Sequence, residues 1–142
     1  MSEKHNGACF CGAIKFELSG EPNVMGYCHC TDCASWAGAP VNAFSLWSPE
    51  NVQVTAGAEQ LGSYAKTPGS QRKYCKVCGG HVFTDHPEMG MVDVYLNNVP
   101  GKAHQGAMHI FYAEKTMSVP DGLPKYADMP AEFGGSGEQL AD

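Results

Sequence analysis

The sequence is poor in positive charge and contains no run of lysine or arginine. Nine basic residues stand against fifteen acidic ones, which gives a formal net charge of −6 over 142 residues. Domains that bind nucleic acids gather positive charge on one face or along one helix. This chain is therefore a poor candidate for that class, and we expect it to have no nucleic-acid partner.

Long apolar segments are also missing. No stretch approaches the roughly 20 apolar residues that a membrane-spanning helix requires, and residues 1–7 lack the apolar segment of a secretory signal peptide. These features predict a cytoplasmic protein with no membrane partner. In a reducing compartment, clustered thiols bind metals or react, and they seldom form structural disulfides.

The cysteines are the most informative residues of the chain, because all seven fall into three tight clusters. The clusters are Cys9 with Cys11, then Cys28 with Cys30 and Cys33, and finally Cys75 with Cys78. An odd number would leave one thiol over in a disulfide framework. No strand–helix–strand pattern surrounds the last pair, which disfavours a thioredoxin-like redox motif. Metal binding is the interpretation that accounts for all three clusters.

Hydrophobic periodicity predicts a mainly β fold. Ile14, Phe16 and Leu18 alternate with polar residues, which is the pattern of a half-buried strand. Turn signals recur at short intervals, as they do in all-β domains. The predicted strands cover residues 13–18, 24–28, 41–47, 52–55, 61–67, 71–75, 82–84, 91–96 and 109–112. At most one or two helical turns are expected, at residues 31–36.

The domain organisation follows from composition. We predict one domain over residues 1–126, with zinc knuckles set into a β-sheet assembly. Residues 127–142 are rich in glycine, glutamate and small side chains. Segments of that composition bury little apolar surface, so we expect a loosely ordered tail.

Two of the cysteine clusters are pairs, and their spacing predicts one closed metal site. Each pair can form a knuckle, and two facing knuckles supply the four thiolates of a tetrahedral zinc site. Gly12 and the Gly79–Gly80 pair suit the tight turns, often with positive φ, that a knuckle needs. The predicted ligands of this structural zinc are Cys9, Cys11, Cys75 and Cys78. Such an ion would tie the N-terminal strand to the middle of the chain.

The third cluster offers three thiolates, so a zinc ion there would keep one position open for water, a thiol or a carbonyl oxygen. Two other interpretations stay open. His29 or Asp32 could close the site and make it purely structural, although His29 in an extended segment would point away from the flanking cysteines. The thiols could also be reactive without a resident metal. A three-thiolate zinc ion suits a soft substrate thiol better than water, and it lowers the pKa of a bound thiol.

The segments around these cysteines resemble the glutathione-dependent formaldehyde-activating enzyme family, also called the centromere protein V family. The similar segments are C-F-C-G-A-I-K-F-E at 9–17, Y-C-H-C-T-D-C at 27–33, Y-C-K-V-C-G-G-H-V-F at 74–83, H-I-F at 109–111 and D-G-L-P-K-Y at 121–126. The resemblance implies the β-rich, Mss4-like zinc fold. It also implies a structural zinc on the paired cysteines and a catalytic zinc on Cys28, Cys30 and Cys33.

The resemblance further implies a reaction. The family joins glutathione and formaldehyde into S-(hydroxymethyl)glutathione, and in the cleavage direction it acts as a carbon–sulfur lyase. The expected partners are therefore a small glutathione-like thiol and a small aldehyde, with zinc as the cofactor. The alternative is a non-catalytic zinc-binding module or a glutathione carrier. The sequence leaves the oligomeric state open.

Several residues outside the clusters are candidates for a substrate site, and each has a plainer interpretation. His109 could donate a proton to an alkoxide. His81 could reach a metal or a substrate, or it could bond to loop backbone. Four basic residues could supply cations for the carboxylates of glutathione, or they could be solvated surface charges: Lys66, Arg72, Lys73 and Lys102. Four aromatic residues could line a pocket or belong to the core: Trp36, Phe44, Trp47 and Phe83.

Overall fold

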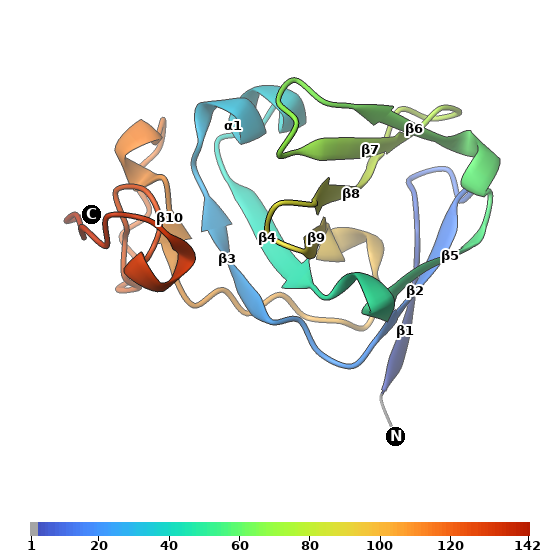
Figure 1. Cartoon of the computed structure of the whole chain (residues 1–142), viewed down its shortest axis with the longest axis horizontal. Helices are drawn as coiled ribbons and strands as arrows, with labels where there is room; N and C mark the ends of the chain where they lie inside the picture. Colours follow the sequence, from blue (N-terminus) through green and yellow to red (C-terminus); the bar gives the residue numbers. More distant parts are fainter. Residues whose placement is uncertain (1–2) are drawn as a thin grey trace. The chain divides into compact units, whose positions relative to one another are not determined.

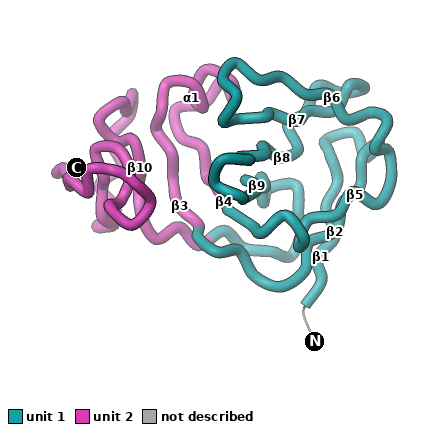
Figure 2. Tube along the Cα trace, viewed as in Figure 1, with its two compact units in different colours: residues 1–24, 45–104 teal, residues 25–44, 105–142 magenta. Residues whose placement is uncertain are grey.

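A computed structural model of the chain describes residues 3–142 and divides into two compact units (Figure 2). Unit 1 comprises residues 1–24 and 45–104, and unit 2 comprises residues 25–44 and 105–142. Short strands provide most of the regular structure, and the α-helix among the described residues is seven residues long (Figure 1). The predicted mainly β fold with a short helical segment is confirmed.

Unit 1 contains a three-stranded antiparallel sheet in the order β1-β2-β5. Its strands are β1 (Lys4–Ala8), β2 (Lys15–Ser19) and β5 (Val52–Ala56). The alternation predicted for β2 is confirmed, because Ile14, Phe16 and Leu18 are buried. Periodicity did not predict β1, whose residues show no apolar alternation. Gly7 makes room in β1 for the Phe16 ring, since a Cβ at residue 7 would lie 2.4 Å from that ring.

The other strands of unit 1 form an antiparallel meander that carries one of the cysteine knuckles. In pairing order they are β9 (Met91–Val94), β8 (His81–His86), β7 (Gln71–Cys75) and β6 (Leu61–Tyr64). The end of β4 (Asn42–Trp47) lies beside β9, with Leu46 opposite Asp93 and Trp47 opposite Val92. Because Trp47 and Val94 have no exposed surface, this edge of the meander belongs to the core.

Short 3-10 turns link the strands of unit 1. They are η1 (Pro49–Asn51), η2 (Ala58–Gln60) and η3 (Leu96–Asn98). The turn η3 explains why β9 ends at Val94 and not at residue 96 as predicted. Within residues 3–142, no helix has both the length and the apolar character that crossing a membrane would require.

Unit 2 is built on two parallel strands from distant parts of the chain. β3 (Val24–Cys28) pairs with β10 (His109–Ile110), so that His109 lies opposite Tyr27 and Ile110 opposite Cys28. The helix α1 (Thr31–Ala37) follows β3 and ends at Gly38, whose φ is 65°. Two 3-10 turns complete the unit: η4 (Tyr112–Glu114) and η5 (Ala131–Phe133).

Residues beyond 126 make hydrogen bonds within unit 2. Tyr126 and Gln139 form an isolated antiparallel bridge. The Leu140 N–H donates to the Lys125 carbonyl over 2.7 Å, and the Ala127 N–H donates to the Glu138 carbonyl over 2.8 Å. The domain boundary at residue 126 stays a prediction.

Candidate metal centres

Unit 1 brings the two cysteine pairs together into one cluster. Cys9 and Cys11 follow β1, whereas Cys75 ends β7 and Cys78 lies in the turn before β8. Their four sulfurs all lie within 4.8 Å of one another. The Sγ atom of Cys11 is 3.8 Å from that of Cys9 and 3.8 Å from that of Cys75. The four cysteines that spacing grouped together therefore meet in space and could hold a metal ion.

The sulfur separations suit a tetrahedral metal ion and not a disulfide. Zinc–sulfur bonds of about 2.3 Å place the corners of a tetrahedron about 3.8 Å apart, which is the distance found between Cys11 Sγ and Cys75 Sγ. A disulfide would bring two sulfurs to about 2.05 Å. All seven cysteines are free thiols.

The backbone of each pair forms a knuckle with a glycine where the predicted turn requires one. Gly12 has a φ of 84° and donates its N–H to the Cys9 carbonyl over 3.0 Å. Gly79 has a φ of 76° and donates in the same way to the Cys75 carbonyl over 2.8 Å. Positive φ is readily available only to glycine, so these positions confirm the predicted conformation of the knuckles.

Backbone amides also point at the sulfurs of this cluster. The Ile14 N–H donates to Cys9 Sγ over 3.3 Å, and the Gly80 N–H donates to Cys78 Sγ over 3.3 Å. Burial alone would raise the pKa of the Cys9 thiol, but the Ile14 N–H and neighbouring thiols lower it to about 7. The Gly80 N–H likewise lowers the pKa of Cys78. Amides that favour the thiolate form prepare the cluster for a cation.

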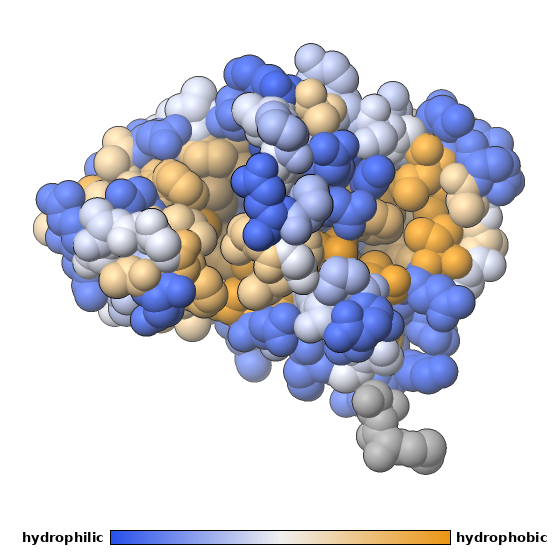
Figure 3. All heavy atoms as spheres, viewed as in Figure 1, coloured by the Kyte–Doolittle hydropathy of each residue, from blue (hydrophilic) through white to orange (hydrophobic). Residues whose placement is uncertain are grey.

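The knuckle of the first pair lies at the surface of unit 1. Phe10, between its two cysteines, is 89% exposed, and Cys11 is exposed as well. Hydrophobic and hydrophilic residues are mixed on the face shown in Figure 3. A metal ion in this cluster would therefore stabilise the fold close to solvent, where a hydrophobic core cannot do so.

Unit 2 holds the second cluster at the junction of β3 and α1. Cys28 ends β3, Cys30 is the N-cap of α1, and Cys33 lies in the first turn of the helix. The three sulfurs lie within 4.8 Å of one another, and Cys28 Sγ is 3.8 Å from Cys33 Sγ. Because Cys30 Sγ accepts the Cys33 N–H over 3.2 Å, the helix cap itself fixes the position of one sulfur.

The electrostatics of this cluster favour a cation. Hydrogen bonds with the Cys30 and Cys33 sulfurs, burial and the proximity of these like charges raise the pKa of Cys28 far above its usual range. Three adjacent thiols therefore resist joint ionisation unless a positive ion compensates their charge. The geometry and the donor set of this cluster fit such an ion.

Neither residue proposed to close this site joins it. The cluster within the described residues contains three sulfurs, without His29 or Asp32. His29 is buried, and its Nε2 lies 2.8 Å from Nδ1 of His109. The alternation of an extended segment predicts this opposite orientation.

A cavity of about 440 Å³ adjoins α1 within unit 2. Its lining residues are Thr31, Ala34, Ser35, Gly38, Ala39, Pro40, Glu114 and Thr116. Thr31 and Ala34 directly follow Cys30 and Cys33 in the sequence. Glu114 also accepts the Thr31 N–H over 2.9 Å, which fixes one wall of the cavity to the start of α1.

Comparison with known proteins decides the family. The sequence model of the glutathione-dependent formaldehyde-activating enzyme family matches residues 4–134. The chain belongs to this family. The matched residues include the four-cysteine cluster and the three-cysteine cluster. The cysteines that carry the resemblance in sequence are therefore the ones that meet in the structure.

Individual relatives agree with this assignment. A Schizosaccharomyces pombe protein, named as an uncharacterized lyase, is 33% identical over 76 residues, which cover 54% of this chain and 53% of that protein. A Pyrenophora teres protein, named provisionally as a glutathione-dependent formaldehyde-activating enzyme, is 32% identical over 103 residues, or 68% of this chain and 54% of that protein. The chain thus spans about half the length of these curated relatives.

A solved structure supports the fold alone. The crystal structure of a Rhodobacter sphaeroides protein matches with a TM-score of 0.58 at 20% sequence identity, covering 69% of this chain and 90% of that chain.

Most of the other candidates from the sequence take structural positions. Phe44, Trp47 and Phe83 are buried, in agreement with the interpretation that they are core residues. Trp36, on α1, is partly exposed. The His81 carbonyl accepts the side-chain amide of Asn98 over 2.8 Å. Burial, with a contribution from the charge of Arg72, lowers the pKa of the His81 ring.

The four candidate cations all lie in unit 1, whereas the three-cysteine cluster lies in unit 2. Lys73 pairs with Asp85 at 4.0 Å, and Lys102 pairs with Glu21. Arg72 is buried, and Lys66 is exposed near the end of β6.

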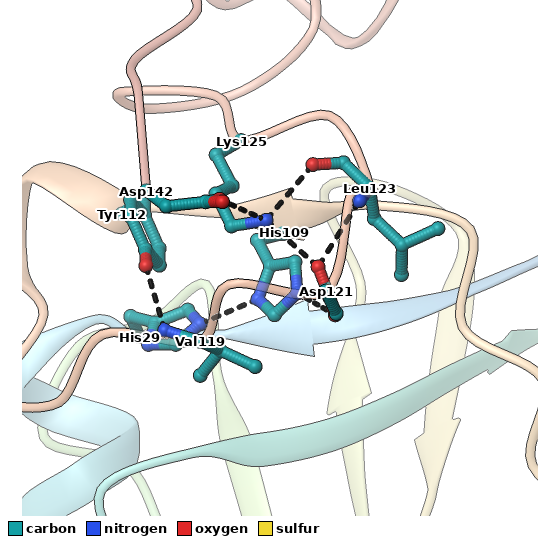
Figure 4. Close-up of polar contacts among 8 residues, drawn as sticks. All are labelled: His29, His109, Tyr112, Val119, Asp121, Leu123, Lys125 and Asp142. Carbon is teal, nitrogen blue, oxygen red and sulfur yellow. Dashed lines mark hydrogen bonds and ion pairs between the residues drawn. The ribbon is translucent and has the colours of Figure 1, made fainter.

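A buried polar network behind β3 was not predicted from the sequence (Figure 4). His29 contacts His109, whose Nε2 lies 2.7 Å from an oxygen of Asp121. The Lys125 ammonium donates to Asp121 over 2.7 Å and pairs with Asp142 at 2.6 Å. Since His109 has a partner on each ring nitrogen, neither nitrogen is left to serve a substrate alkoxide. The signal in the sequence was that His109, Asp121 and Lys125 all lie in the family-like segments at 109–111 and 121–126.

Proposed function

We propose that this protein is a zinc-dependent enzyme that joins a glutathione-like thiol to formaldehyde and also cleaves the resulting adduct, as a carbon–sulfur lyase. In this proposal Cys28, Cys30 and Cys33 hold a catalytic zinc, and Cys9, Cys11, Cys75 and Cys78 hold a structural one. The observation that carries the proposal is the three-sulfur cluster at the start of α1, in a chain of this family that also has a complete four-sulfur cluster.

The chemistry required of the protein is modest. Zinc bound to three thiolates would hold a substrate thiol in its ionised form at neutral pH. The ionised sulfur of the substrate would attack the carbonyl carbon of formaldehyde, so that a carbon–sulfur bond would form while the carbon–oxygen π bond would break. The resulting alkoxide takes up one proton, which balances the proton that the thiol released. Cleavage is the reverse of the same steps.

The residues of unit 2 would position the two reactants. The Cys30 cap fixes one sulfur at the start of α1, and the same helix supplies several of the cavity-lining residues. The hydroxyl-bearing side chains of Thr31, Ser35 and Thr116 line that cavity and are exposed, so they can bond to the peptide groups of a glutathione-like molecule. Holding both reactants at one place removes much of the entropic cost of a bimolecular reaction.

One observation bears on the thiol that either candidate would bind, the enzyme or a zinc module that binds a thiol without turnover. The residues that line the cavity include Glu114 and no lysine or arginine. The two carboxylates of glutathione require cations for tight binding. A cavity with this lining therefore suits a thiol with less negative charge than glutathione.

An exchange experiment separates the two candidates. The zinc-loaded protein is added to glutathione and formaldehyde at equilibrium, and the exchange between free and adduct forms is followed by NMR. The proposal predicts a clear increase over the spontaneous exchange rate, which Cys30→Ser abolishes. Saturable binding without any increase in exchange would favour the binding module and contradict catalysis on this substrate pair.

A further inference from the structure

We propose that His109 is a positioning residue for the three-cysteine segment and that it acts through His29. This inference rests on the proposed function only in assigning a zinc ion to Cys28, Cys30 and Cys33. His109 would touch neither the metal nor the substrate, because its ring is buried and its two nitrogens face His29 and Asp121. Its role would be to hold residue 29, and with it the two flanking sulfurs, in place.

The strand β10 holds residue 29 at two points. The His29 N–H donates to the Ile110 carbonyl over 3.0 Å, which continues the parallel pairing of β3 with β10. The His29 ring is held separately, by the 2.8 Å contact of its Nε2 with His109 Nδ1. Cys28 and Cys30 are the immediate neighbours of His29, so a rotation of this residue would change the sulfur separations that suit a metal ion.

His109 is itself rigidly held. The ring stacks on Tyr27 with centroids 4.9 Å apart, and it meets Tyr112 edge-on at 5.6 Å. Its Nε2 lies 2.7 Å from Asp121, whose other oxygen accepts from the buried Lys125 ammonium over 2.7 Å (Figure 4). Because these contacts hold the His109 ring, that ring can in turn hold the His29 side chain in one position.

The partners determine where the hydrogen atoms lie. An ionised Asp121 only accepts, so His109 Nε2 carries a proton, and in the tautomer with its proton on Nε2 alone His109 offers the Nδ1 lone pair to a proton on His29 Nε2. This arrangement leaves His29 Nδ1 without a proton. That atom is buried and has no hydrogen-bond partner among the described residues, and a buried lone pair without a partner is more tolerable than a buried N–H.

Two substitutions at one position test the inference. The side-chain oxygen of asparagine can occupy the place of His109 Nδ1, so His109→Asn keeps an acceptor for His29 but loses the contact with Asp121. The longer glutamine reaches the place of Nε2, so His109→Gln keeps the Asp121 contact but loses the acceptor for His29. The matched control is Asp128→Asn, because Asp128 accepts from Ser136 and is not part of the network.

The first measurement is the rate at which each protein releases its two zinc ions to a chelator. The zinc ion of the four-cysteine site, which we expect to be released slowly, serves as an internal control for folding. We expect His109→Gln to release the ion of the three-cysteine site about 10- to 100-fold faster, whereas His109→Asn and Asp128→Asn release it near the wild-type rate. Equal effects of asparagine and glutamine, or no effect of glutamine, would overturn the inference. A wild-type protein that binds a single zinc would overturn it as well.

The second measurement needs no substitution and no activity. Long-range proton–nitrogen NMR spectra of the wild-type histidines at neutral pH report which ring nitrogens carry protons. We expect a protonated Nε2 and a bare Nδ1 in both His29 and His109. A proton on Nδ1 of either residue would contradict the assignment. The outcome is separable from the proposed function, because an inactive protein can still show these tautomers and release rates, and an active one can lack them.

Discussion

The sulfur of Cys11 lies 3.8 Å from that of Cys75, although 64 residues separate the two in the sequence. The contact joins the segment after β1 to the end of β7 within unit 1. Bringing such distant residues together costs conformational entropy, which the free energy of metal binding would offset in the folded state. A metal ion at this point would therefore contribute to folding, and at Cys28, Cys30 and Cys33 it would serve chemistry.

Cys75→Ser tests this division of roles. Cys75 has no exposed surface, and its sulfur is part of the four-sulfur cluster. We expect the variant to lose one zinc and to unfold at a much lower temperature, or to fail to fold, because the free energy of structural zinc binding is free energy of folding. Thermal unfolding followed by circular dichroism, with zinc content measured on the same sample, checks this.

The matched control for Cys75→Ser is Cys33→Ser. This variant also removes one sulfur, but from a cluster whose members lie close together in sequence. We expect it to unfold near the wild-type temperature and to lose the exchange activity. Equal losses of melting temperature in both variants would contradict the proposed roles.

Filling the cavity beside α1 should impair substrate binding without loss of metal. Ser35 lines the cavity and is exposed, so a tryptophan at residue 35 can occupy the space without disturbing the core. We expect Ser35→Trp to raise KM for the thiol about tenfold or more, with zinc content unchanged. Ala37→Trp, on the same helix but outside the lining, is the control. An unchanged KM in Ser35→Trp would place the substrate elsewhere.

The network behind β3 predicts a pH dependence of stability. Burial would raise the pKa of Asp121, but hydrogen bonds from Lys125 and His109 outweigh it and hold the pKa below its ordinary value of 3.8. A carboxylate with a lowered pKa stabilises the folded state above its ordinary pKa, and this contribution is lost as the pH falls through the lowered value.

Asp121→Asn removes that contribution. We expect a loss of about 1 kcal/mol in the free energy of unfolding at neutral pH, a modest figure because the carboxylate is partly exposed. Urea denaturation at neutral pH and below pH 3.8 should show the difference between wild type and variant shrinking toward the acid end. A difference independent of pH would mean that the ionised carboxylate does not stabilise the fold.

Zinc binding to the three-cysteine cluster should release protons. The pKa of Cys28 is raised by the adjacent thiols and by burial, so this thiol is protonated at neutral pH in the absence of metal. Zinc must displace that proton, and its affinity should therefore rise with pH. Calorimetric titration in two buffers of different ionisation enthalpy measures the protons released, on folded protein that keeps the zinc of its four-cysteine site and has lost only the zinc of its three-cysteine site. Binding without proton release would show that the thiols do not ligate the ion.

The sequence predicted the local parts of both metal centres well. The knuckle glycines and the alternation of Ile14, Phe16 and Leu18 are local signals, and the structure agrees with them. The grouping of four and three cysteines followed from spacing, because each short cluster can fold only a few ways around one ion.

The parts that escaped prediction depend on contacts between distant residues. His29 and His109 are 80 positions apart, and they meet because β3 and β10 pair in parallel. Lys125 is 2% exposed because two carboxylates compensate its charge, and nothing in its local sequence indicates burial of a lysine. Strand β1 was not predicted because it forms by pairing with β2 and has no apolar pattern of its own.

The most direct test of the account is the number of zinc ions per chain in the wild type and in Cys30→Ser, measured by elemental analysis on folded protein. Two clusters that could each hold one ion predict two zinc ions per wild-type chain. They predict one, still bound in the four-cysteine site, in the variant. A single zinc in the wild type, or the same content in both proteins, would contradict the assignment of a metal ion to Cys28, Cys30 and Cys33.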